Sequence, residues 1–292
     1  MIAMGLLGTA SQFGLEASGK IRRVGSNVKD LGPGDLVGIL RSGIYQSRIL
    51  THRHTCWRIT KKLSLEAAAA MMVPYLTAMY ALLHAANLKK NQVCTLNKSL
   101  PMSLGDTLLT LIFADGSRSL SLWRCWTCRC SHLSSDWGQG RLSISKSFEL
   151  NASPLISFKV YATVGSDEKA QYLSDQCSLS RDEIFNSRDD SFVNKIMLAT
   201  GRRGVDVVLN SLAGKLLHAS WQCVASFGKM IELGKVDFAT NGNLSMTPFA
   251  KNRAFIGVDL LDIGHERPEL LKWYVFQRTV SCVPYDSHHT VK

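Results

Sequence analysis

The stretch that decides the fold is residues 205–234, VDVVLNSLAGKLLHASWQCVASFGKMIELG. Its first part, 205–210, is apolar and ends in polar residues, which is typical of a buried strand. A helix is predicted over 214–224, with Gly228 at its end, followed by a second strand over 229–234. Strand, helix and strand in this order form the repeating unit of a parallel sheet.

The same alternation extends upstream of this stretch. A strand is predicted at 159–165, a helix opening at Ser166 with acids in its first turn, a short strand at 183–186 and a helix from Asp190. Short apolar strands separated by amphipathic helices indicate an α/β fold with a doubly wound parallel sheet. Ligands bind such sheets beyond the carboxyl ends of the strands, so the residues that follow each strand are the site candidates.

The first seventy residues have a different pattern. The run 13–23 predicts a strand that is broken at Gly25, and 31–34 predicts a turn before another short apolar strand. Such a series is typical of a small β-barrel. Ser64 then caps a helix that begins with consecutive alanines.

Residues 67–86 form an uncharged stretch of membrane-spanning length. Much of the stretch is alanine, which is only weakly hydrophobic, and proline interrupts the helical ladder. We therefore predict two buried helices joined at Val73-Pro74 and no membrane span.

Composition narrows the possible partners. The 292 residues carry 34 Lys and Arg against 23 Asp and Glu, a net charge of +11 that favours anionic partners. The basic residues are scattered and form no basic-aromatic module, so nucleic-acid binding is not expected. Eight cysteines are too few for a disulfide scaffold at this length, which predicts reduced thiols and a cytoplasmic location.

Several residues after the predicted strands suit a phosphate-bearing dinucleotide. Ser166 and Lys169 follow the strand at 159–165, where a hydroxyl and a cation in place of an acid favour the 2′-phosphate of NADPH over NADH. Ser187 and Arg188 follow the next strand, and arginine can hold a phosphate in a fork. The alternative is a helix-capping serine and surface basic residues with no ligand.

Longer motifs resemble a known family. These are VDVVLNSLAG (205–214), HASW (218–221), FGKMIELGK (227–235) and NRAFIGVDL (252–260), with FGLEASG (13–19), GDLV (34–37) and VPYLTAMYAL (73–82) in the front half. Together the chain resembles, over 13–92 and 159–265, the enoyl reductase domains of fungal-type, highly reducing polyketide synthases, in the medium-chain dehydrogenase/reductase superfamily. The resemblance implies a GroES-like catalytic domain fragment at 1–75, an NADP-binding Rossmann-like domain at 76–265 and an atypical tail at 266–292.

The resemblance also implies an activity, which is NADPH-dependent reduction of the α,β-double bond of a polyketide or fatty acyl thioester held on an acyl carrier domain. Lys235 and Asp259 match the family's catalytic pair, for which a surface ion pair is the alternative. The implied cofactor contacts are Ser166, Lys169 and Arg188 at the 2′-phosphate, Thr77 and Asn210 at the nicotinamide, and Ser211. A homodimer is also compatible with the resemblance.

Zinc is not expected, although related alcohol dehydrogenases use it. Their zinc-binding branch has a histidine directly before the conserved glutamate, and this chain has Leu15 before Glu16. Cys125, Cys128 and Cys130 are closely spaced but lack a convincing fourth ligand.

Residues 93–150 lack the family pattern. A dinucleotide fold needs a strand, a glycine-rich turn and a helix there, but no intact GxGxxG is present. Gly138-Gln-Gly is a weak trace of the turn, and Gly105 is a candidate for the displaced start of the first strand. We interpret the segment as a retained intron or a shifted reading frame, in a chain that also looks truncated.

Two alternatives to an active enoyl reductase therefore stay open. One is an inactive fragment that lacks a working pyrophosphate loop. The other is a quinone-reductase-like oxidoreductase of the same superfamily that acts on a free small molecule.

Overall fold

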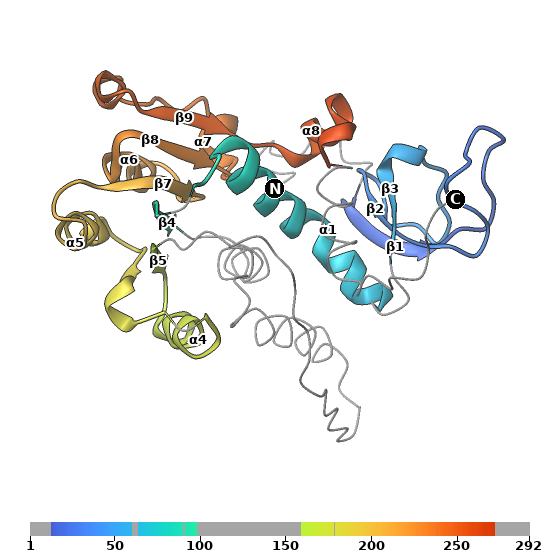
Figure 1. The fold of residues 1–292 in the computed structure, drawn as a ribbon, viewed down its shortest axis with the longest axis horizontal. Coiled ribbons are helices and arrows are strands. Elements are labelled where there is room, and N and C mark those ends of the chain that lie inside the picture. The colour runs from blue at the N-terminus through green and yellow to red at the C-terminus, as the bar shows by residue number, and fades with distance from the viewer. Residues whose placement is uncertain (1–12, 60–63, 90, 98–158, 178, 272–292) are drawn as a thin grey trace, which may run out of the picture. The chain divides into compact units, whose positions relative to one another are not determined.

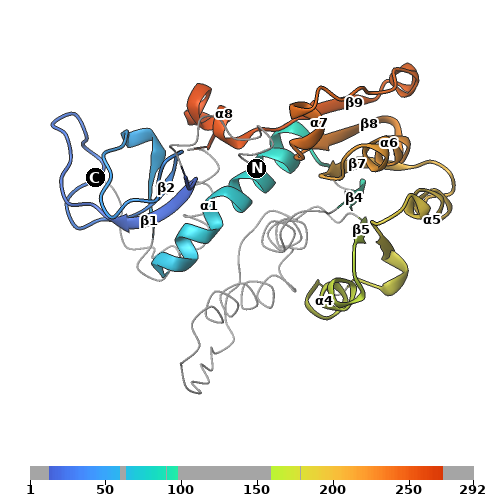
Figure 2. The ribbon, with the colours of Figure 1, turned by 180° about the vertical axis from the view of Figure 1, so that it is seen from behind.

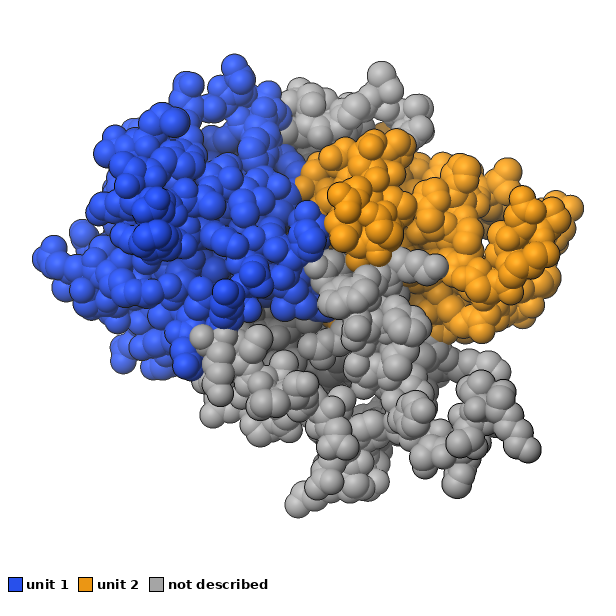
Figure 3. All heavy atoms as spheres, turned by 45° about the horizontal axis from the view of Figure 1, so that its top comes forward, with its two compact units in different colours: residues 1–8, 78–258 blue, residues 9–77, 259–292 orange. Residues whose placement is uncertain are grey.

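The computed structural model describes residues 13–59, 64–89, 91–97, 159–177 and 179–271. The chain divides into two compact units, coloured separately in Figure 3. Unit 1 comprises residues 1–8 and 78–258, and unit 2 comprises residues 9–77 and 259–292.

Unit 1 contains a six-stranded parallel sheet (Figure 1). Its strands are β4 (Val93–Asn97), β5 (Lys159–Val164), β6 (Ile184–Asn186), β7 (Val205–Asn210), β8 (Val224–Glu232) and β9 (Ala254–Gly257). They lie in the order β6-β5-β4-β7-β8-β9, and every neighbouring pair is parallel. Counted along the chain this is 3-2-1-4-5-6, the order of dinucleotide-binding sheets. The predicted doubly wound parallel sheet is confirmed.

Helices connect these strands. They are α4 (Asp167–Cys177), α5 (Ser191–Ala199), α6 (Lys215–Gln222) and the short α7 (Val236–Ala239), with 3₁₀ turns η5 (Arg181–Glu183) and η6 (Thr247–Lys251). α4 contacts β5, α5 contacts β6, and α6 contacts β7 and β8. The Ser166 hydroxyl accepts a hydrogen bond from the Lys169 N–H at 3.4 Å, so this serine caps α4 as its position predicts.

The core of unit 1 forms around Trp221 on α6, which is almost fully buried. Its ring lies 5.0 Å from that of Phe249 and 6.0 Å from that of Phe255, in tilted and edge-on arrangements that aromatic pairs favour. Phe192 and Ile196 of α5 belong to the same buried cluster. The apolar faces of the two helices thereby fix the sheet from which the site residues project.

The predicted helix end at Gly228 is wrong, because β8 already begins at Val224. Val224 pairs with Val205, but the next pair joins Val207 to Lys229, so the intervening residues of β8 form a bulge. A Cβ at Gly228 would lie 2.8–3.0 Å from Val224 and from the carbonyls of Ala225 and Asp206. Gly228 therefore allows close backbone packing inside a strand.

The central strand β4 occupies the first five residues of the segment 93–150 that lacks the family pattern. It lies between β5 and β7, with Cys94 fully buried. The start of the first strand is therefore Val93 and not Gly105, which lies outside the described residues together with Gly138. Residues 93–97 form this buried strand although the segment as a whole lacks the family motifs.

Unit 2 contains a three-stranded antiparallel sheet in the order β1 (Glu16–Lys20), β2 (Leu36–Leu40) and β3 (Cys56–Arg58), with the 3₁₀ turn η2 (Arg53–Thr55) before β3. Helix α8 (Leu260–Glu266) also belongs to this unit. Leu31, Val37 and Cys56 form a small buried cluster against the sheet. The described strands agree with the small β-domain that the sequence predicts.

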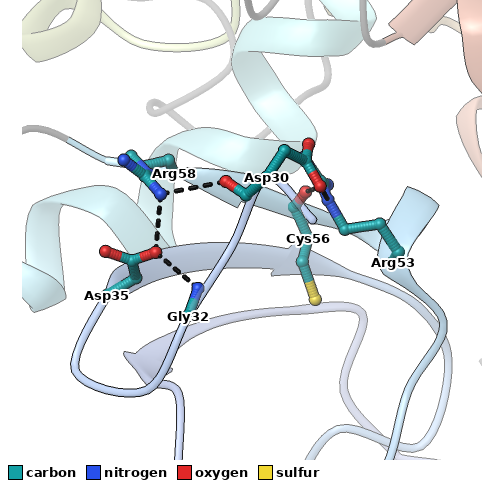
Figure 4. A network of polar contacts seen from close by, with 6 residues as sticks. All are labelled: Asp30, Gly32, Asp35, Arg53, Cys56 and Arg58. Atoms are coloured by element: carbon teal, nitrogen blue, oxygen red, sulfur yellow. Dashed lines mark hydrogen bonds and ion pairs between the residues drawn. The ribbon is translucent and has the colours of Figure 1, made fainter. Parts of the chain in front are cut away.

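A polar network fixes the loop before β2 to strand β3 (Figure 4). The Arg53 guanidinium binds both carboxylate oxygens of Asp30, and its Nη1 donates to the Cys56 carbonyl at 2.5 Å. Arg58 donates to the Asp30 carbonyl at 2.9 Å and to the Asp35 carboxylate at 2.7 Å. These contacts explain the local structure of the turn, and they involve none of the predicted site residues.

Helix α1 (Leu65–Met79), labelled in both views of the ribbon in Figures 1 and 2, continues into a π-helical turn, η3 (Tyr80–Ala85). The predicted break at Val73-Pro74 is therefore wrong, because Pro74 lies inside a continuous helix. The Glu16 carboxylate accepts a hydrogen bond from the Val73 N–H at 2.6 Å, which stabilises the backbone where proline disturbs the ladder. Among the described residues, no helix is both long enough and apolar enough to cross a membrane.

Candidate cofactor site and catalytic residues

Buried polar side chains gather at the carboxyl ends of the parallel strands. Asn97 ends β4, Thr163 lies near the end of β5, Asn210 ends β7 and is followed by Ser211, and Glu232 ends β8; all are buried. Polar groups are seldom buried without a structural or functional reason. This edge of the sheet is where ligands bind in doubly wound folds.

The strand order reverses between β4 and β7, and Asn97 pairs directly with Asn210 at that point. The Ser211 N–H and hydroxyl both donate to the Asn97 carbonyl, at 3.2 and 3.3 Å. The Asn97 side chain donates to the Ser220 hydroxyl at 2.6 Å. The structure therefore brings two predicted cofactor residues, Asn210 and Ser211, to the switch point of the sheet.

Glu232 is the buried acid of this edge, and the sequence analysis did not select it. Its Oε2 accepts from the Asn210 amide at 2.6 Å, and its Oε1 accepts from the Gly234 N–H at 2.7 Å. Burial raises the pKa of the Glu232 carboxyl to about 7, against the opposing effect of these hydrogen bonds. A charged residue at the end of an apolar strand was the available sequence signal.

Two amide oxygens at the switch point lack a partner within the described part of the chain. The Oδ1 atoms of Asn97 and Asn210 are both buried without a hydrogen bond. Both atoms are acceptors, so the group that fits them carries N–H or O–H donors. The nicotinamide riboside half of a dinucleotide carries such donors in its carboxamide and ribose hydroxyls, and the residues present therefore fit this cofactor.

The predicted 2′-phosphate residues meet at the ends of β5 and β6. The Arg188 Nε donates to the carbonyl of Gly165, the residue before Ser166, at 3.1 Å. Arg188 and Ser166 are exposed, and Lys169 is half-buried in the first turn of α4. The acid of that turn, Asp167, forms an ion pair with Arg181 at 3.3 Å.

The two residues of the predicted catalytic pair belong to different units. In unit 1 the half-buried Lys235 donates from Nζ to the Val258 carbonyl at 2.8 Å. In unit 2 Asp259 caps α8 by accepting from the N–H groups of Leu261 at 2.9 Å and Asp262 at 3.3 Å. Their pairing stays a prediction, as does the contribution of Thr77, which is buried on α1 in unit 2.

No cluster of three or more histidine, cysteine, aspartate or glutamate side chains suited to a metal ion occurs among the residues that the structure describes. Glu16 hydrogen-bonds the backbone of α1, and burial raises the pKa of its carboxyl. Cys125, Cys128 and Cys130 lie outside the described residues.

The parallel sheet, its buried polar edge and the antiparallel sheet of unit 2 define a medium-chain dehydrogenase/reductase. The family model described as zinc-binding dehydrogenase matches residues 152–275. Among solved structures, the CurK enoyl reductase is 24% identical with a TM-score of 0.67, over 92% of this chain and 67% of that one. The JamJ enoyl reductase in its apo form is 22% identical with a TM-score of 0.67, over 96% and 70%. These likenesses show the fold, including the GroES-like domain expected from the sequence.

Sequence relatives define the family more narrowly. The highly reducing polyketide synthase lcsB of Purpureocillium lilacinum is 37% identical over 92% of this chain. The corresponding synthases ALT1 of Alternaria alternata and FUM1 of Gibberella moniliformis are 38% and 36% identical over 89% and 97% of it. By these likenesses the chain is an enoyl-reductase-type domain of the medium-chain dehydrogenase/reductase superfamily. It spans only 8–9% of the length of these relatives.

Proposed function

We propose that this chain is an NADPH-dependent enoyl reductase that reduces the α,β-double bond of a polyketide or fatty acyl thioester on an acyl carrier domain. The observation that carries the proposal is the buried polar edge of unit 1, where Asn97, Asn210 and Ser211 meet at the switch point of a dinucleotide-type sheet. The net charge of +11 suits both the phosphates of the cofactor and an acidic carrier.

The cofactor specificity is assigned to the ends of β5 and β6. Arg188 and Lys169 supply positive charge and Ser166 a hydroxyl, which together suit the 2′-phosphate of NADPH. Asp167, the acid of the same turn, forms an ion pair with Arg181. The exposed Arg188 is therefore the proposed main ligand of the phosphate. At the other end of the cofactor, Asn210, Ser211 and Thr77 are the proposed contacts near the nicotinamide.

The proton chemistry is assigned to Lys235. A bound NADPH supplies the hydride that reduces the β-carbon. The Lys235 ammonium, positioned by its hydrogen bond to the Val258 carbonyl, stabilises the negative charge that develops on the thioester oxygen and donates a proton to the α-carbon. Asp259 follows Val258 in the chain and is proposed as the second residue of the catalytic pair.

The cofactor assignment is tested with Arg188→Leu, using as the control Lys251→Leu, an exposed cation that precedes β9 at the opposite edge of the sheet. Binding of NADPH and NADH is followed by fluorescence titration of the full chain. Loss of a charge-assisted hydrogen bond should weaken NADPH about tenfold or more and leave NADH unchanged. Equal weakening of both cofactors in Arg188→Leu would contradict a 2′-phosphate contact.

The activity is tested by oxidation of NADPH with a crotonyl thioester on an acyl carrier domain. Lys235→Met should reduce the rate at least about a hundredfold if the lysine donates a proton, while the exposed Lys251→Met should not. A chain that shows no saturable NADPH signal would instead be an inactive fragment, and one that reduces only free quinones would be quinone-reductase-like. The homodimer and the cytosolic location stay predictions from the sequence.

A further inference from the structure

The orientation of the Asn210 side chain is fixed by its neighbours. Its Nδ2 donates to two acceptors, the Leu212 carbonyl at 2.8 Å and the Glu232 carboxylate at 2.6 Å. A rotation of the amide by half a turn would place its oxygen against both acceptors, which is unfavourable. The two hydrogen bonds of Nδ2 therefore fix the position of the amide oxygen of this buried side chain. That oxygen has no hydrogen-bond partner within the described residues.

Only a carboxylate can hold this arrangement from position 232. Glu232 accepts from two different N–H donors, one on each oxygen: the Asn210 amide and the Gly234 backbone. A glutamine would have one acceptor for these two donors, so one N–H would face its amide nitrogen. The backbone of Gly234 approaches the acid closely, because a Cβ at this residue would lie 2.6 Å from Glu232 Oε1.

We propose that Glu232 is a positioning residue that holds the Asn210 amide oxygen as the acceptor for the carboxamide N–H of the bound nicotinamide. The inference rests on the proposed function, since it assigns the ligand of an atom at the same site. A phosphate does not fit this position, because a phosphate and an amide oxygen are both acceptors. The carboxamide supplies the donor that Asn210 lacks and would orient the nicotinamide ring at the switch point.

The test compares three oxidised cofactors by isothermal titration calorimetry of the full chain at about pH 8, where the Glu232 carboxyl is mainly ionised because burial raises its pKa to about 7. They are NADP⁺, its thionicotinamide analogue, which keeps the N–H donor, and its 3-acetylpyridine analogue, which lacks it. We expect wild type to bind NADP⁺ and the thionicotinamide analogue about five- to tenfold more tightly than the acetylpyridine analogue. Glu232→Gln should lose most of this preference, while the exposed Glu168→Gln should keep it.

The outcomes distinguish failure of the proposed function from failure of the proposed positioning of Asn210 by Glu232. Wild type that binds no nicotinamide cofactor would refute the proposed function. Wild type that binds NADP⁺ and the acetylpyridine analogue equally would refute the contact with Asn210 and leave the proposed function intact. A full preference retained in Glu232→Gln would refute the positioning by Glu232.

A second measurement needs no variant, in case Glu232→Gln does not fold. Protonation of Glu232 leaves one strong acceptor for its two donors, so the preference of wild type should fall when the pH is lowered from about 8 to about 6. The charged groups acting on Glu232 are Asp237, which raises its pKa, and Lys235, which lowers it. The 2′-phosphate is common to the three cofactors and cancels in the ratio of affinities, and a ratio that does not change with pH would refute the positioning by Glu232.

Discussion

Replacing Glu232 with glutamine should change how the stability of unit 1 depends on pH. Burial raises the pKa of Glu232 from its ordinary value of 4.5 to about 7, so the folded protein binds this proton more tightly than the unfolded chain. The stabilisation from this proton is complete below about pH 4.5 and is lost as the pH rises through about 7. Ionisation of Glu232 thus opposes folding at neutral and higher pH.

The size of the effect follows from the two pKa values. The interval from 4.5 to about 7 corresponds to about 3 kcal/mol, at 1.36 kcal/mol for each pH unit. Glutamine does not titrate, so this part of the pH dependence is absent from the Glu232→Gln variant, whatever the variant's unfolding free energy is at a given pH. Between about pH 5 and pH 8, the free energy of unfolding of wild type should therefore fall by about 2–3 kcal/mol relative to that of Glu232→Gln.

The assay is urea unfolding followed by circular dichroism at several pH values across this range. Glu168→Gln makes the same change in charge at an exposed position of α4 and serves as the control. The quantity that matters is the difference in unfolding free energy between each variant and wild type. Parallel curves for wild type and Glu232→Gln would refute the raised pKa and the burial that explains it.

Three further changes test the packing of unit 1. Lys229→Met should lower the unfolding free energy by about 2 kcal/mol in urea titrations, because the Lys229 ammonium donates to the carbonyls of Ala85 and Ala86 at 3.3 and 2.9 Å. Gly204→Ala should lower the thermal unfolding midpoint, with a loss of at least about 2 kcal/mol, since Gly204 has φ +86° and a Cβ would lie 2.5 Å from the Cys223 carbonyl. Trp221→Ala should cost about 3–5 kcal/mol and increase proteolysis of unit 1, because it empties the centre of the buried cluster. Unchanged midpoints in these variants would contradict the contacts described.

The strands of unit 1 were predictable because their signals are local. The apolar run 205–210 ends in polar residues, and so the sequence alone indicates both a buried strand and the edge at which a ligand binds. Asn210 and Ser211 were predicted as cofactor contacts from the family motif, and the structure places both residues at this edge. The contact of these residues with Asn97 was not predicted, because it depends on the pairing of β4 with β7.

The features that the sequence analysis missed depend on distant residues. Helix α1 continues through Pro74 because a carboxylate 57 positions earlier, on Glu16, binds the Val73 N–H. Gly228 lies in a bulge whose geometry is set by the neighbouring strand β7. The sequence marks Glu232 only as an acid at the end of an apolar strand, because its contact with Asn210, 22 positions away, depends on the pairing of β7 with β8.

The division of the chain has a consequence for folding during synthesis. Residues 78–258 of unit 1 lie between the two parts of unit 2, 9–77 and 259–292, which are therefore separated by about 180 residues. At typical rates of translation, the ribosome takes roughly 10–40 s to make the intervening chain. All six strands of unit 1 are therefore synthesised after β1 to β3 and before α8, so unit 2 becomes complete only after the whole parallel sheet has been made.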